Sequence, residues 1–228
     1  MRISYLFATA SLWLGGSMLF AAPCAIGSLQ SYISLGATGC SVGAVDYQSF
    51  TIVPGLNGAT VINPANVTVT PGGSQFNTTL MLGLTDAANA GQLLDLIFRV
   101  RAGGLLTASS VAINSPTITG NGAATAILDV CAAGNFAGNS PTGCSTTAQS
   151  ALAVAVAGGP NQLTDSVTFP VSSFFDIFFD VTLDSGGAGS AALSSATLGV
   201  NAVPEPSAIV LVALGISAIG YRRLRRQQ

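Results

Sequence analysis

The stretch Phe175-Asp176-Ile177-Phe178-Phe179-Asp180-Val181-Thr182-Leu183-Asp184 decides the fold class of this chain. Its odd-numbered positions all carry large apolar side chains, whereas three of its even-numbered positions carry aspartate. Successive side chains of a β-strand point to opposite faces, so this alternation predicts a strand that buries one face. The three aspartates, Asp176, Asp180 and Asp184, are then expected in one row on the outer face.

The same alternation recurs at residues 76–84 and 92–101. In the second segment it places Leu94, Leu96, Phe98 and Val100 on one face and Asp95, Ile97, Arg99 and Arg101 on the other. Further strands are expected at residues 45–53, 67–70, 110–114, 124–130, 151–157, 165–171 and 196–201, with turns at 57–58, 71–73, 121–122, 158–160 and 185–187. Many short strands without a convincing internal helix predict an all-β fold, an antiparallel β-sandwich.

Composition excludes most catalytic mechanisms. The chain has no histidine and no lysine, and its only glutamate is Glu205. Nucleophilic sites that use histidine or lysine as the base therefore cannot form, and we expect no enzyme and no cofactor. Hydrolysis by aspartates alone stays open as an alternative, but nothing in the sequence selects a pair. Residues 184–187, Asp-Ser-Gly-Gly, match short protease motifs, although a glycine-rich hairpin turn explains them more simply.

The charge balance bears on partners. Residues 23–203 contain two arginines and eight aspartates, a net charge of −6. Such a surface repels phosphate backbones, so we expect no nucleic-acid partner. Successive aspartates of the row lie about 13 Å apart along the backbone and cannot share one ion. A calcium site would need Asp129 or Asp165 as well, so a solvated strand face is the simpler interpretation and no metal site is predicted.

Four cysteines are spaced for two local disulfides. Cys131 and Cys144 enclose a turn-rich loop, and Cys24 and Cys40 enclose a segment of similar length. We predict the pairs Cys24–Cys40 and Cys131–Cys144, each of which would stabilise the fold by about 3 kcal/mol. The rival, a tetrathiolate zinc site, lacks any Cys-x-x-Cys pair.

Residues 1–22 have the features of a secretory signal peptide. A single arginine, Arg2, precedes an apolar segment at residues 3–20, and small residues follow it. This pattern predicts a signal helix and cleavage by signal peptidase. Cleavage after Ala21 or Ala22 would keep all four cysteines, whereas cleavage after Gly27 would leave three, so the earlier position is favoured.

The last 26 residues form a second targeting segment in three parts. Prolines keep the first part, Val203, Pro204, Glu205 and Pro206, extended. An uncharged segment of about 21 Å predicts a short transmembrane helix, and the four arginines behind it stop transfer through the membrane. The helix comprises Ala208, Ile209, Val210, Leu211, Val212, Ala213, Leu214, Gly215, Ile216, Ser217, Ala218, Ile219, Gly220 and Tyr221, and the stop-transfer residues are Arg222, Arg223, Arg225 and Arg226.

The triplet Pro204-Glu205-Pro206, followed by an apolar segment and then by arginines, resembles the PEP-CTERM sorting signal. Residues 24–50 and 178–191 are also similar to a group of uncharacterised PEP-CTERM proteins. The resemblance implies recognition by exosortase, a membrane-embedded protease, which is thought to cut near the triplet. It divides the chain into a signal peptide at 1–22, an exported β-sandwich at 23–202 and a sorting signal at 203–228.

The resemblance implies a bacterial protein that crosses the inner membrane, is anchored there transiently and then reaches the cell surface or the medium. Its expected role is structural or adhesive, linked to biofilm, and its expected partners are exosortase, signal peptidase, the inner membrane and extracellular polysaccharide. The alternative is a secreted glycan- or calcium-binding module, or a carboxylate-only hydrolase, that carries the same signal.

Overall fold

A computed structural model describes residues 21–55, 58–138 and 140–204. Residues 1–20 of the predicted signal peptide (1–22) and the predicted transmembrane helix at 208–221 lie outside these residues, as do Glu205, Pro206 and the terminal arginines. Among the described residues, no helix has both the length and the apolar character needed to cross a membrane.

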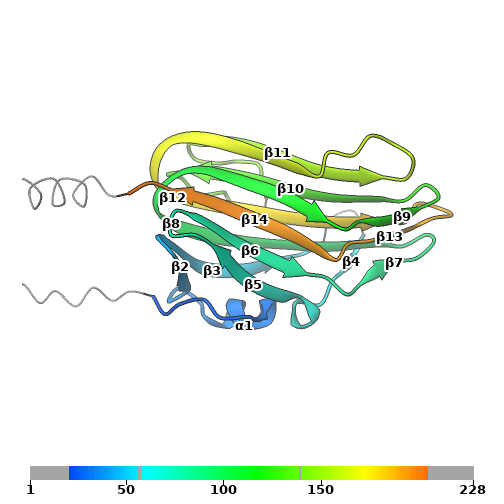
Figure 1. The fold of residues 1–228 in the computed structure, drawn as a ribbon, viewed down its shortest axis with the longest axis horizontal. Helices are drawn as coiled ribbons and strands as arrows, with labels where there is room; N and C mark the ends of the chain where they lie inside the picture. The colour runs from blue at the N-terminus through cyan, green and yellow to red at the C-terminus, as the bar shows by residue number, and fades with distance from the viewer. Residues whose placement is uncertain (1–20, 56–57, 139, 205–228) are drawn as a thin grey trace, which may run out of the picture.

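The described residues form a mostly antiparallel sheet of eleven strands and a second sheet of three (Figure 1). The strands of the large sheet are β1 (Gly27–Ser28), β2 (Cys40–Val42), β3 (Val45–Val53), β4 (Thr60–Val61), β5 (Thr68–Gly73), β6 (Asn77–Gly83), β8 (Leu93–Asn114), β10 (Ala123–Ala132), β11 (Thr147–Val156), β12 (Thr164–Asp184) and β14 (Ser195–Ala202). The small sheet contains β7 (Ala87–Ala88), β9 (Thr117–Thr119) and β13 (Ser190–Ala192). The all-β, antiparallel prediction is thus confirmed.

Two long strands, β8 and β12, organise the large sheet because they pair with each other over almost their whole lengths. Residues 93–103 of β8 and 174–184 of β12 lie between β3 and β10, and β2 and β11 follow outside them; we call this part the first half-sheet. Residues 106–114 of β8 pair with β14, and β6, β5 and β1 follow; with residues 164–168 of β12 they form the second half-sheet.

The two half-sheets meet where both long strands bend. In β8 the bend contains Gly104, whose φ of 131° suits glycine, and a Cβ there would lie 2.7 Å from a backbone oxygen. In β12 the pairing register shifts between Thr168 and Phe174. The half-sheets face each other across the core, since the hydroxyls of Tyr47 on β3 and Thr78 on β6 hydrogen bond at 2.7 Å although these strands do not pair.

The core lies between the half-sheets and contains the predicted inward rows. Phe175, Ile177, Phe179, Val181 and Leu183 of β12 are all fully buried. Aromatic rings run through this core from Tyr32 to Phe50, Phe98 and Phe179, with successive centroids 5.2, 6.3 and 5.5 Å apart. The alternation therefore identified the core side correctly at residues 76–84, 92–101 and 175–183.

Three local predictions are wrong. Residues 92–101 and 110–114 belong to one strand, β8, and residues 165–171 and 175–183 to another, β12, because the chain bends there without leaving the sheet. Residues 71–73 end β5 and do not form a turn. A short helix, α1 (Leu29–Ser34), and a 3-10 turn, η1 (Pro64–Asn66), were not predicted, and the Ser28 side chain caps α1 by accepting a hydrogen bond from Ser31 N.

Residues 152–156 of the outer edge of β11 are hydrogen bonded by the segment that follows β11 and by the start of β12. Leu152 N donates to Asp165 Oδ2 at 3.0 Å, Val154 N donates to Gln162 O at 2.6 Å, and Val156 N donates to Asn161 Oδ1 at 3.0 Å. Donors that are already bonded cannot recruit another strand, so this edge is protected against pairing with other chains.

Candidate functional site

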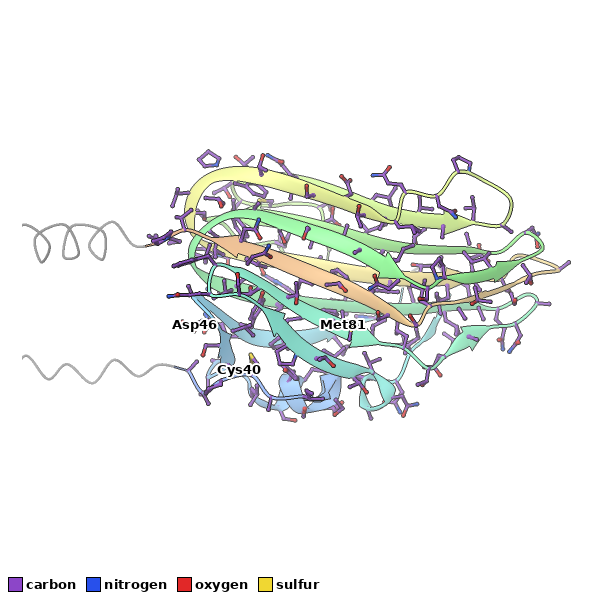
Figure 2. All side chains as sticks on the ribbon, viewed as in Figure 1. Cys40, Asp46 and Met81 are labelled. Carbon is purple, nitrogen blue, oxygen red and sulfur yellow. A yellow bond between two sulfur atoms is a disulfide. The ribbon has the colours of Figure 1, made fainter. Side chains whose placement is uncertain are left out.

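Both predicted disulfides are present. Cys24–Cys40 joins the start of the described chain to β2, and Cys131–Cys144 closes the segment that follows β10. Their Cα atoms lie 4.8 and 5.6 Å apart, within the usual range. Figure 2 labels Cys40 next to β2 and Asp46 near the start of β3. The second disulfide matters for the candidate site because it closes residues 133–138 and 140–146, which we call the disulfide loop. Phe136 of this loop lies over the outer face of the first half-sheet.

A second apolar cluster lies between this loop and the outer face. Its five buried members are Val53 of β3, Ile97 of β8, Cys131 of β10, Phe178 of β12 and Phe136 of the loop. The rings of Phe136 and Phe178 meet edge to face, with centroids 5.1 Å apart. The outer face is therefore covered here, whereas the alternation predicted that it would face solvent.

The first aspartate of the predicted row is buried under the same loop. The side chain of Asp176 is 3% exposed and forms a two-point ion pair with Arg99, in which Arg99 Nε donates to Oδ1 at 2.8 Å. Phe136 N donates to Asp176 Oδ2 at 2.9 Å. Arg99 also donates to the carbonyl oxygens of Phe136 and Gly138 at 3.2 and 3.1 Å, and its bond to Asp176 raises its pKa. The interpretation of the row as a solvated strand face is thus wrong at Asp176, because β12 is an inner strand and the loop covers it.

A polar hollow of about 270 Å³ adjoins this ion pair. It is lined by Ser49 and Thr51 of β3, Arg99 and Arg101 of β8, and Asp176 of β12. The Arg101 guanidinium lies over the ring of Phe174, 4.6 Å from its centroid, and donates to Asn135 Oδ1. Both arginines of residues 23–203 therefore line one hollow. Sequence reasoning missed this site, although two arginines on one strand face in an acidic region were a usable signal.

The second aspartate of the row, Asp180, is paired with another acid. Its side chain hydrogen bonds to that of Asp95 on β8, and the Thr182 hydroxyl lies 2.7 Å from Asp95 Oδ1 and 3.1 Å from Asp180 Oδ1. Burial, and then the charge of Asp95, raise the pKa of Asp180 to about 7. Burial also raises the pKa of nearby Asp129, an effect reduced by its hydrogen bond from Ser150. Asp180 therefore keeps its proton up to about pH 7, beside the carboxyl group of Asp95.

This pair predicts a pH-dependent stability that Asp180→Asn should remove. The folded protein keeps the Asp180 proton up to about pH 7, whereas an ordinary aspartate loses it near 3.8, so stability falls as the pH rises between these values. At pH 8 an asparagine amide would donate permanently to Asp95. Thermal unfolding followed by circular dichroism should give a variant melting temperature about 2–4 °C above the wild type at pH 8, with a flatter pH profile.

The exposed Asp46, replaced by asparagine, is the matched control for this experiment, and its melting curve should follow the wild type. A wild-type melting temperature that rises from pH 5 to pH 8 would contradict the shared proton. The expected difference in melting temperature between Asp180→Asn and the wild type is small, because Asp180 is only partly buried and solvent screens its charge.

The remaining sequence candidates are structural. Asp184 Oδ1 accepts a hydrogen bond from Gly186 N at 2.7 Å, so residues 184–187 lie at a turn as predicted. This turn closes no hairpin, because β12 pairs in the large sheet and β13 in the small one. Asp165 accepts from Leu152 N and Ser166 N, which lowers its pKa, and lies at the β11 edge. Within the described ranges, no three acidic, cysteine or histidine side chains gather as metal ligands.

Of the sorting residues, Val203 and Pro204 fall in the described part of the chain. Val203 N donates to Leu105 O at 2.7 Å, at the bend of β8. At the other end, Ser41 binds Ala21 and Ala22 and pairs with Asp46, which in turn pairs with Gly103. Both ends of the described chain thus leave the sheet beside the same bend, as Figure 1 also shows.

Comparison with protein-family models and with curated proteins finds no match. Among solved structures, the chain is similar to the enzymatically active domain of bacteriophage CBA120 tailspike protein 4, with 12% sequence identity and a TM-score of 0.23. The likeness covers 75% of this chain and 20% of that one, so this chain spans about a fifth of the other's length. A likeness this low carries no argument about activity.

Proposed function

We propose that the chain is an exported bacterial cell-surface or extracellular-matrix protein, a substrate of exosortase with a structural or adhesive role. The observation that carries the proposal is the order of Pro204-Glu205-Pro206, the apolar residues 208–221 and the arginines 222–226. Two disulfides support export, because such bonds persist in oxidising compartments outside the cytoplasm. The exported part is a β-sandwich whose facing half-sheets share two bent strands.

The position of the chain ends supports the proposed topology. Both ends leave the sheet beside residues 103–105, so one end of the domain can face the membrane while both terminal segments are still attached. Cys24 and β1 are built into the fold through a disulfide and through pairing with β5. Cleavage after Gly27 would remove Cys24, so we propose that signal peptidase cuts after Ala21 or Ala22.

We propose no catalytic role. The nearest approach of two carboxyl groups that we identify, Asp95 with Asp180, is a direct hydrogen bond. Glycoside hydrolases hold their two carboxyl groups about 5 Å or more apart, which leaves room for the sugar or water between them. Because Asp180 keeps its proton, the two acidic side chains can lie side by side in the sheet without repelling each other.

Intact mass and membrane fractionation, in cells with and without exosortase, test the sorting proposal. With exosortase, the product should begin at Ala22 or Pro23, lack residues 208–228 and leave the membrane. Without exosortase, it should keep these residues and stay in the membrane. Replacing Pro204, Glu205 and Pro206 together by alanine should give the second result in both strains, and Ser207→Ala is the matched control. A tail retained in the membrane in both strains would overturn the proposal.

A further inference from the structure

The polar hollow beside the disulfide loop has the size and chemistry of a small binding site. Its volume of about 270 Å³ is just under the range of about 300–1,000 Å³ typical of small-molecule sites. Hydroxyls from Ser49 and Thr51, two guanidinium groups and one carboxylate line it. Its walls are therefore mainly polar, and they suit a ligand that forms hydrogen bonds.

One wall of the hollow is the Arg99–Asp176 ion pair, which is electrically neutral and whose hydrogen-bonding groups already have partners. Arg99 uses its side-chain donors on both oxygens of Asp176 and on two carbonyl groups of the disulfide loop. Asp176 in turn accepts from Arg99 and from Phe136 N. Because each group has its partners, this pair holds the shape of the hollow and offers little to a ligand.

Arg101 is different, because it carries a charge without a counter-ion in the part of the chain that the structure describes. There the Arg99–Asp176 pair is the one ion pair. The Phe174 ring and Asn135 Oδ1 hold the Arg101 guanidinium in place. A guanidinium has five N–H donors, and its fork matches a carboxylate. Arg101 is thus an oriented, partly buried cation at the edge of the hollow in a region of net charge −6.

Two hydroxyls that line the hollow come from an irregular part of β3, the strand next to β8. The pairing of β3 with β8 shifts between Gln48 and Thr51, and Ser49 there has a φ of 58°, which is unfavourable for a residue other than glycine. Ser49 N donates to Gly36 O at 2.8 Å, and this bond helps to hold the conformation. The bulge brings the Ser49 and Thr51 side chains to the same hollow, where they can meet hydroxyl groups of a ligand.

We propose that this hollow binds a small polyhydroxylated carboxylate, a sugar acid. The carboxylate would pair with Arg101, and the ligand hydroxyls would bond to Ser49 and Thr51. One uncompensated cation matches one negative charge, whereas a phosphate dianion would leave excess negative charge in an already acidic domain. The inference rests on the geometry of the hollow and not on the export proposal, so either can fail without the other.

Ligand titration of the full chain, purified in detergent, tests this site by isothermal calorimetry or ligand-observed NMR. Glucuronate should bind in the millimolar range or tighter, and glucose and inorganic phosphate should bind more weakly. Arg101→Met should weaken glucuronate binding by about tenfold or more, because a charge-assisted hydrogen bond is lost. Thr51→Val keeps the shape of the side chain and should weaken binding by a smaller factor.

Ser110→Ala is the matched control, since Ser110 lies on the half of β8 that belongs to the second half-sheet. It should bind glucuronate as the wild type does. If Arg101→Met does not fold, the glucuronate affinity of Thr51→Val alone decides whether the assignment of the site holds. Unchanged affinity in both variants, equal binding of glucose, tighter binding of phosphate, or no binding of glucuronate would each overturn the assignment.

Discussion

Replacing Asp176 with alanine is expected to lower the free energy of unfolding by about 3–5 kcal/mol. The change leaves the Arg99 guanidinium without its two-point partner and Phe136 N without an acceptor, both beneath the disulfide loop. Breaking a buried ion pair costs more than the pair contributes, because one charge stays behind in a region of low polarity. A quarter of the Arg99 side chain is exposed, so water can solvate part of that charge and the lower end of the range is expected. Urea unfolding, followed by far-ultraviolet circular dichroism, measures this change in the free energy of unfolding.

Asp46→Ala is the matched control for this prediction, because Asp46 is an exposed aspartate of the same half-sheet, labelled in Figure 2. It should change the free energy of unfolding by no more than about 0.5 kcal/mol. Arg99→Ala and the double variant complete a cycle, and the double variant should cost less than the sum of the single changes by about 0.5–3 kcal/mol. Equal effects of Asp176→Ala and Asp46→Ala would contradict the buried ion pair.

Phe98→Ala is the second change with a large expected effect, also about 3–5 kcal/mol. Phe98 is 1% exposed and lies between the rings of Phe50 and Phe179, at the centre of the aromatic core. Its loss leaves a cavity that the two paired strands on either side of β8 cannot close, since their registers are fixed by hydrogen bonds. The midpoint of urea unfolding should fall, while the slope of the transition should stay as in the wild type.

Phe98→Leu is the control that separates lost volume from lost aromatic contact. Leucine fills much of the space, so this variant should lose distinctly less stability than Phe98→Ala. A further control, Val171→Ala, changes a side chain that is 59% exposed and should have little effect. A Phe98→Ala variant as stable as Val171→Ala would show that the two half-sheets do not close over a packed core.

The strands were predictable where a local pattern decides them. Residues 45–53 form β3 as expected, and the inward residues of β12 are those that the alternation selected. The bends were not predictable, because Gly103-Gly104 and Pro170 look like the ends of strands. In the structure the chain turns from one half-sheet into the other at these residues and keeps its pairing on both sides. A break in local pattern cannot distinguish a bend from an end.

The candidate site shows the same limit more clearly. Alternation placed Arg99, Arg101 and Asp176 on the outer face of their strands, and this is correct. It could not bring Arg99 to Asp176, 77 residues later, because that contact follows from the register of β8 with β12. Nor could it show that the disulfide loop covers Asp176, although the cysteine spacing did predict the loop itself.

The sequence alone determined the all-β class, the core side of the main strands and both disulfides, because each depends on residues close together in the chain. The pairing of the chain's acids and bases, the bends that join the half-sheets and the hollow at Arg101 were decided by tertiary structure alone. An outward side chain is buried only if another part of the chain packs on that face of the sheet. Alternation with a period of two residues shows which face a side chain is on, but not what packs against that face.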